Sequence, residues 1–227
     1  MVWFDPMYFV FIAPALILGL WAQYRVKATY AQAQRMPAPL SGAAAARHVL
    51  DSSGLQNIDI EQIPGHLSDH YDPRHKVLRL SPEVYQSRSL AAVGIAAHEA
   101  GHALQDAKAY APLVVRNAAV PAASFGSNAS FFLILLGIMF QPLHSLVLVG
   151  IILFSFVVFF QIVNLPVEFN ASNRAKAQLV SLGIVPPQEM TYINKVLNAA
   201  ALTYVAGTLQ SIMILLYYIL RYAGSRD

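Results

Sequence analysis

The sequence contains no cysteine among its 227 residues, and only 12% of the residues are charged. Without cysteine there is neither a disulfide framework nor a thiolate metal site, so any metal ion has to be held by histidine and carboxylate side chains. The charged fraction lies well below the roughly 25% typical of soluble domains. The net charge of +3 is small and dispersed, and we expect no nucleic-acid partner. Because hydrophobic residues make up 56% of the chain, the composition predicts a membrane protein.

Four apolar segments are long enough to cross a bilayer, which takes about 20 residues in a helix. They lie at about residues 3–23, 118–140, 143–165 and 202–220. The first begins near Trp3, lacks a positively charged start and lacks a small-residue cleavage site, so we interpret it as a retained helix and not a signal peptide. The second contains small polar residues between Ser124 and Ser130, which suit close helix packing in lipid. Alternatively, that helix begins later, near Phe131.

The distribution of basic residues predicts the orientation of these spans. Residues 24–117 and 166–201 lie on the same side, and most Lys and Arg residues near the membrane are found there. The other side offers only Arg221 and Arg226. The positive-inside rule therefore places residues 24–117 and 166–201 in the cytoplasm. We expect a multi-pass protein of the cell membrane with the lipid bilayer as a partner.

Residues 24–117 combine helical and strand patterns, bounded by capping residues, glycine and a turn-rich stretch. The expected elements, in chain order, are a helix from the N-cap Ser41 to Gly54, a strand at 57–63, a loop at 65–75, a strand at 76–81 and a helix at 89–106.

The helix at 89–106 carries the segment HEAGH, residues 98–102. Its spacing puts His98 and His102 on one helix face, with Cβ atoms about 5–6 Å apart, where both imidazoles can bind one zinc ion. Glu99 projects to the side of that face, where a general base can take a proton from an attacking water molecule. The pattern therefore predicts a metal site with a neighbouring base.

Catalytic zinc normally has three protein ligands, so a third has to come from elsewhere in the chain. Glu168 is the best candidate, because it follows the third span and lies on the same predicted membrane side as the motif. Gly101 costs about 1 kcal/mol relative to Ala within a helix. It would let another helix, such as that of Glu168, approach closely; the alternative is ordinary helix packing without chemical consequence.

Three segments resemble, in order and at suitable spacing, the YugP-like family of membrane zinc metallopeptidases: SDHYDPRHKVLRLSPEVY (68–85), AAHEAGHALQ (96–105) and VEFNASNRA (167–175). The resemblance implies a mainly α, four-span membrane protein with a small α+β zincin-like catalytic domain. It also implies a gluzincin-type site in which His98, His102 and Glu168 hold one zinc ion and Glu99 is catalytic. In this enzyme type the strand at 76–81 can offer a free edge to an extended substrate, although an ordinary sheet strand is the simpler interpretation.

A more distant similarity is to HtpX-like peptidases, which carry an Asp four residues after the ligand Glu as a partner for a ligand histidine. Here that position is Ser172, whose hydroxyl orients an imidazole more weakly than a carboxylate does. His70, Tyr71 and Arg174 are candidates to stabilise the oxyanion, although a positive-inside charge is the favoured interpretation of Arg174. His66, His70 and His75 could form a second metal site, but a solvated, turn-rich loop is favoured.

The sequence thus predicts a single membrane domain over residues 1–227, acting as a zinc-dependent endopeptidase on proteins or peptides in or near the membrane. One alternative is a non-catalytic membrane adaptor whose partner-binding domain is stabilised by zinc. Another is an intramembrane protease, which is disfavoured because the chain has no Asp-Gly dipeptide and because the charged residues Arg88, Asp106 and Lys108 bracket the motif helix.

Overall fold

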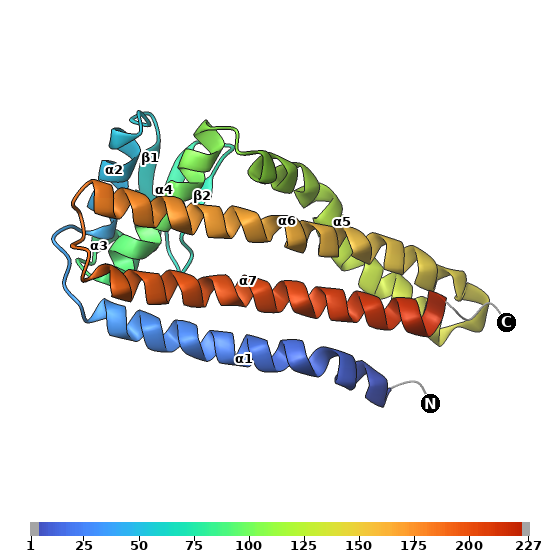
Figure 1. Cartoon of the computed structure of the whole chain (residues 1–227). Helices are drawn as coiled ribbons and strands as arrows, with labels where there is room; N and C mark the ends of the chain where they lie inside the picture. The colour runs from blue at the N-terminus through green and yellow to red at the C-terminus, as the bar shows by residue number, and fades with distance from the viewer. Residues whose placement is uncertain (1–4, 224–227) are drawn as a thin grey trace. The chain divides into compact units, whose positions relative to one another are not determined.

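The structure is a computed structural model, and it describes residues 5–223 (Figure 1). Trp3, at the start of the first predicted span, and Arg226, used in the charge argument, lie outside the described residues. Of the described residues, 76% are helical, and they include four helices long and apolar enough to span a membrane and one small sheet of three strands. The predicted fold class is therefore confirmed.

The four long helices extend beyond the predicted spans. Helix α1 reaches Gln34, α6 continues through Pro166 to Ser181, and α7 begins at Met190. Helix α5 runs unbroken through Ser124 and Ser130, so it does not begin near Phe131. The bounds are α1 Pro6–Gln34, α5 Ala111–Met139, α6 Ser145–Ser181 and α7 Met190–Tyr218, with the short helices η1 Gln141–Leu143 and η2 Ile219–Ala223.

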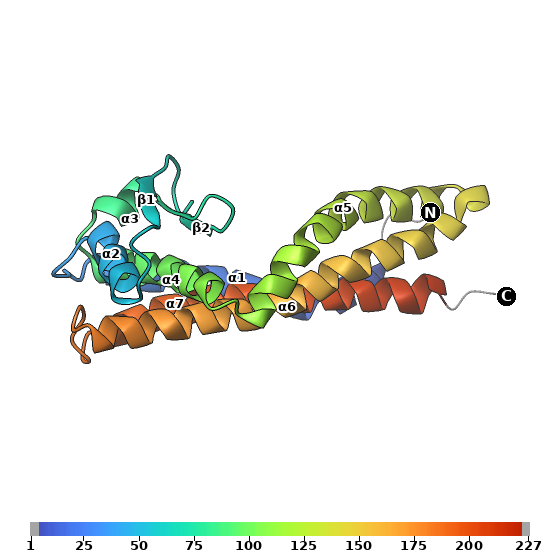
Figure 2. The same cartoon turned by 90° about the horizontal axis from the view of Figure 1, so that it is seen from above.

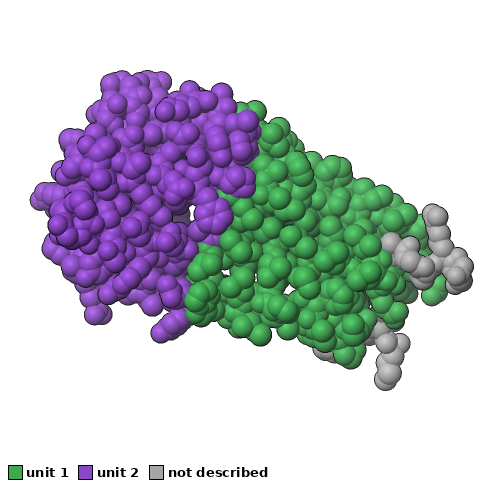
Figure 3. Space-filling model, in the orientation of Figure 1, with its two compact units in different colours: residues 1–22, 114–165, 202–227 green, residues 23–113, 166–201 purple. Residues whose placement is uncertain are grey.

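The chain divides into two compact units, coloured separately in Figure 3. Unit 1 comprises residues 1–22, 114–165 and 202–227. In it α5 and α6 pack closely, because a Cβ added at Gly126 would lie 2.6 Å from the carbonyl oxygen of Leu153. The hydroxyl of Thr208 on α7 donates to the Gln161 carbonyl of α6, and Tyr217 on α7 donates to Asp5 ahead of α1. Small residues and side-chain hydrogen bonds thus join these helices, as expected for segments surrounded by lipid.

Unit 2 comprises residues 23–113 and 166–201 and contains the sheet and the motif helix. Its shorter elements are α2 Gly42–Ser52, β1 Asp59–Gln62, β2 His70–Asp72, β3 Val77–Leu80, α3 Pro82–Gln86 and α4 Leu90–Ala107. The predicted cap of α2 is confirmed, because Ser41 Oγ accepts a hydrogen bond from the Ala44 amide. Ser89 caps α4 in the same way, accepting from Ala92. Each cap satisfies one of the amide groups that the first helical turn leaves free.

The sheet corrects two expectations. Its order is β1-β3-β2, with β1 parallel and β2 antiparallel to β3. The segment 65–75 was expected to be a loop, yet it contains β2, in which buried Tyr71 pairs with Leu78. A strand of three residues is too short to show alternation in the sequence. Of the two interpretations of the strand at 76–81, the free edge is wrong and the ordinary sheet strand is confirmed, because β3 is paired on both sides.

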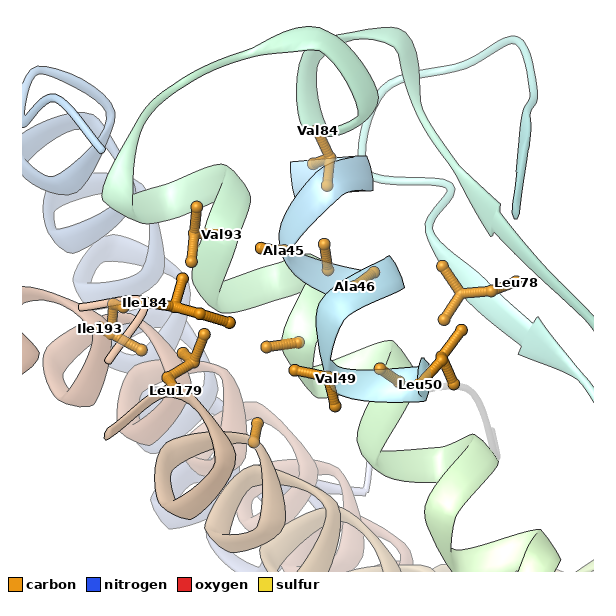
Figure 4. Packing of buried hydrophobic residues seen from close by; sticks show 14 of the residues in the cluster. Ala45, Ala46, Val49, Leu50, Leu78, Val84, Val93, Leu179, Ile184 and Ile193 are labelled. Carbon is orange, nitrogen blue, oxygen red and sulfur yellow. The ribbon is translucent and has the colours of Figure 1, made fainter. Parts of the chain in front are cut away.

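The core of unit 2 joins elements that are far apart in the sequence (Figure 4). Alanine and valine from α2 and α4 face leucine and isoleucine from β3, the end of α6, the α6–α7 connection and α7, which holds the motif helix from several sides. The labelled core residues are Ala45, Ala46, Val49, Leu50, Leu78, Val84, Val93, Leu179, Ile184 and Ile193.

Candidate metal centre

Helix α4 presents the two motif histidines side by side. His98 is partly buried and His102 is 9% exposed. Their ring centroids lie 4.8 Å apart, with the ring planes at 82°. The four-residue spacing on a regular helix accounts for this proximity, and the alanines around the motif leave room for both rings.

Helix α6 brings the third candidate to the same point. Glu168 is 4% exposed, and its Oε2 lies 3.3 Å from His98 Nε2 and 3.7 Å from His102 Nε2. The three candidate ligand atoms all lie within 4.8 Å of one another. Residues separated by about seventy positions in the sequence therefore converge, as the argument from membrane sides anticipated.

Gly101 permits this convergence. A Cβ atom added at Gly101 would lie 2.5 Å from the carbonyl oxygen of Ala171, which is backbone of α6. Real Cβ contacts are essentially never that short, so no side chain fits between the two helices at this point. The predicted close approach of the Glu168 helix to the motif helix is confirmed, and Gly101 has a packing reason that outweighs its low helix propensity.

The geometry fits a zinc ion. Oε2 of Glu168 is buried and accepts no hydrogen bond from any residue between 5 and 223, a costly state for a carboxylate oxygen unless a cation lies beside it. Zinc ligands at about 2.0–2.1 Å in a tetrahedral arrangement lie about 3.3 Å from one another. The 3.3 Å from Glu168 Oε2 to His98 Nε2 matches that spacing, and the 3.7 Å to His102 Nε2 is slightly longer.

Each imidazole is held through its other nitrogen. His98 Nδ1 lies 3.1 Å from the hydroxyl of Ser172, the position that the comparison with HtpX-like peptidases singled out. His102 Nδ1 lies 3.0 Å from Oε1 of Gln105, which is fully buried. The sequence analysis missed Gln105. The available signal was its position three residues after His102, which puts it near the same helix face.

Glu99 is partly buried next to these groups. Burial raises the pKa of the Glu99 carboxyl above its ordinary value, and the negative charges of Glu168 and Asp69 act in the same direction. The positive charge that His98 and His102 can carry opposes the rise. The side chain therefore lies within electrostatic reach of all three candidate ligands, as a general base for this site has to.

The oxyanion candidates have other contacts. His70 Nδ1 lies 2.8 Å from the Ser68 carbonyl oxygen, and Arg174 donates to Asn170. The Tyr71 hydroxyl donates its single hydrogen to Asp106, an arrangement that leaves no donor for an oxyanion. Burial, followed by that hydrogen bond, raises the pKa of Tyr71. The oxyanion role stays a prediction.

The three loop histidines do not gather around a common point. His66 pairs with Glu83 and His75 pairs with Asp72, each at 2.7 Å. Within residues 5–223, the one group of three or more His, Asp or Glu side chains close enough to hold a metal ion is His98, His102 and Glu168. Among the described residues the three loop histidines are therefore not brought together as a second metal site, and His70 belongs to strand β2.

The chain is similar to a described protein family and to a bacterial relative. Residues 8–223 match the model of a family described as "Putative neutral zinc metallopeptidase". The chain belongs to this family. It is also 45% identical over 224 residues to the "Putative membrane protease YugP" of Bacillus subtilis (strain 168), an alignment covering 97% of this chain and 99% of that protein. No solved structure gives a significant match.

The predicted membership in the YugP-like family is thereby confirmed. The family supports zinc as the metal, protein as the substrate class and association with a membrane. The four apolar helices agree with the last of these.

Proposed function

We propose that the protein is a zinc-dependent endopeptidase of the HExxH, gluzincin type, in which His98, His102 and Glu168 hold one zinc ion. The observation that carries the proposal is the buried Glu168 oxygen lying 3.3 Å and 3.7 Å from the two imidazole Nε2 atoms. Burial of the carboxylate without a hydrogen-bond donor is best accounted for by a cation at that point.

Glu99 performs the proton transfers in this proposal. Zinc at the site supplies a Lewis acid that polarises the peptide carbonyl and lowers the pKa of water to about 7. Glu99 takes one proton from the attacking water molecule while the oxygen of that water bonds to the carbonyl carbon. It then delivers that proton to the peptide nitrogen as the carbon–nitrogen bond breaks, which yields a carboxylic acid and an amine. Transfer of the remaining water proton from the new acid to the amine leaves a carboxylate and an ammonium group.

The position of the site along the chain suggests its substrates. Glu168 follows the predicted span 143–165 by three residues, and α6 is continuous between them. We therefore infer a site near the cytoplasmic surface of the cell membrane, with segments of membrane proteins or membrane-adjacent proteins as substrates. The excess of basic residues at 24–117 and 166–201 supports the cytoplasmic orientation.

The two alternatives have less support. Structural zinc sites normally have four protein ligands, whereas the group found among residues 5–223 has three, which leaves a position for water or substrate. That favours a catalytic site over an adaptor. An intramembrane protease would carry its motif within a span, and the four candidate spans found among the described residues do not include α4.

Exchanging Glu99→Gln tests the mechanism while leaving the proposed ligands intact. Purified protein in detergent is assayed with zinc on labelled casein and on a membrane-protein substrate. We expect hydrolysis to fall by about 10²–10⁴-fold, because the proton acceptor is lost. Bound zinc, measured by metal analysis, should stay at one ion per chain. The partly buried Glu189, on the α6–α7 connection, provides the matched control Glu189→Gln, which should keep full activity. Undiminished hydrolysis by Glu99→Gln would rule out this mechanism.

A further inference from the structure

Gln105 lies between the two helices that carry the candidate ligands. It is fully buried on α4, one turn past His102. Its amide nitrogen donates to the carbonyl oxygen of Val167, the residue before Glu168 on α6, at 2.8 Å. The same nitrogen donates to Asn170 Oδ1 at 3.1 Å. A buried amide whose two ends contact different helices links their positions at the point where the ligands meet.

These contacts determine which His102 nitrogen carries hydrogen. The Val167 carbonyl can only accept, so the Gln105 atom facing it has to be the amide nitrogen. The amide oxygen then faces His102 Nδ1 and can only accept. His102 therefore donates from Nδ1, and in the neutral imidazole this leaves the lone pair on Nε2, the atom that lies 3.7 Å from Glu168 Oε2. A metal ligand needs its free lone pair at this nitrogen.

A second link extends the network beyond Gln105. Asn170 Oδ1 also accepts from Nε of Arg174 at 2.7 Å, and the Arg174 guanidinium lies 5.9 Å from the ring centroid of Tyr110. Tyr110 is in turn bonded to Gln105, because its amide donates to the Gln105 carbonyl. Arg174, an oxyanion candidate in the sequence, thus holds the partner of Gln105 in place in this structure.

We propose that Gln105 is a positioning residue that sets the tautomer of His102 and the placement of Glu168 with a single side-chain amide. The inference rests on the proposed zinc site. Ser172 differs, because it contacts His98 and belongs to α6 itself. Gln105 is the residue of α4 that contacts both His102 and the backbone next to Glu168.

Two substitutions separate positioning from packing. Gln105→Met keeps the volume and removes the three side-chain hydrogen bonds, to His102, Val167 and Asn170. Gln105→Glu restores an acceptor for His102 but places a charge in a buried position and cannot donate to Val167. We measure zinc affinity by competition with a chromogenic chelator, and the melting temperature of the zinc-free protein in detergent. Gln86→Met, at an exposed site on α3, is the control.

If Gln105 positions His102 and Glu168, zinc affinity and melting temperature should rank the variants in different orders. Zinc affinity should fall by about 10- to 100-fold in Gln105→Met and by less in Gln105→Glu, since the acceptor for His102 is restored. The melting temperature should instead be lowest for Gln105→Glu, because its charge is buried. Wild-type zinc affinity in Gln105→Met, or affinities that follow the melting temperatures, would overturn the proposal. If the wild-type protein binds no zinc, the proposed function is itself wrong, and not only the role proposed for Gln105.

Discussion

The contact between Gly101 and Ala171 leads to the sharpest test of the site, because it alters the geometry without touching a ligand. The substitution Gly101→Ala adds one methyl group to α4. The added Cβ would lie 2.5 Å from the Ala171 carbonyl oxygen, 3.1 Å from its carbonyl carbon and 3.3 Å from its Cα. All three are backbone atoms of α6, so rotation of a side chain cannot relieve the overlap.

The size of the displacement follows from these distances. Ordinary contact begins at 3.4 Å, so relief requires the two helices to separate by roughly 0.5–1 Å near Ala171, at a cost of about 1–3 kcal/mol for overpacking. Glu168 lies one turn before Ala171 on the same helix. Zinc–ligand distances tolerate only about ±0.2 Å, so the carboxylate would leave the ligand position. We expect zinc affinity to fall by about 10- to 100-fold and hydrolysis at fixed zinc by on the order of 10²-fold.

The control uses another glycine of the same helix. A Cβ added at Gly94 would meet the Cγ2 methyl group of Ile193 at 3.0 Å, which is a side-chain contact with α7 and involves no backbone atom of α6. Gly94→Ala should therefore alter stability without altering zinc affinity. Zinc binding is measured by chelator competition and folding by circular dichroism. A folded Gly101→Ala protein that binds zinc and cleaves substrate like the wild type would refute the reasoning.

Two further predictions concern the metal and the membrane orientation. Chelation should lower the melting temperature by about 5–10 °C, because zinc at 100 times its Kd stabilises the folded state by about 2.7 kcal/mol. Chelation should leave the melting temperature of the Glu168→Ala variant unchanged. A wild-type melting temperature that is insensitive to chelator would contradict the proposed zinc site. The absence of native cysteine allows single-cysteine labelling of intact cells with an impermeant maleimide. Gln141→Cys should react at once and Gln56→Cys only after permeabilisation; the reverse pattern would invert the proposed orientation.

Features that depend on local sequence were predictable. The cap Ser41 and the helix carrying His98 and His102 follow from residue type and short-range spacing. Glu168 was identified from a longer-range argument. The predicted spans assign each connecting segment to one side of the membrane, and the segment that follows the third span lies on the same side as the motif. The predicted sides place Glu168 with the motif, but nearly all the other carboxylates of the chain lie on that side as well, so its position directly after the third span was the additional signal. Neither observation supplies the distance at which the carboxylate lies.

Features that depend on pairing between distant segments were not predictable. Strand β2 has three residues, and its partner β3 determines its conformation, since Tyr71 is buried only when it lies opposite Leu78. Gln105 is similar. A glutamine in an alanine-rich helix is ordinarily exposed, and its burial depends on the Val167 carbonyl of another helix. Neither partner can be read from the residues near it in sequence.

The charge balance of the site gives a reason for Ser172 where a distant family has a carboxylate. In the proposed site, a divalent cation held by Glu168, with ionised Glu99 beside it, would give zero net charge. Both imidazole partners, Ser172 and Gln105, are neutral and preserve that balance. An aspartate at position 172 would add an uncompensated negative charge to a position that is 5% exposed, and uncompensated buried charge is costly. The Ser172 hydroxyl orients His98 without that cost. Serine is therefore better suited than aspartate to this buried position, although it orients the imidazole more weakly.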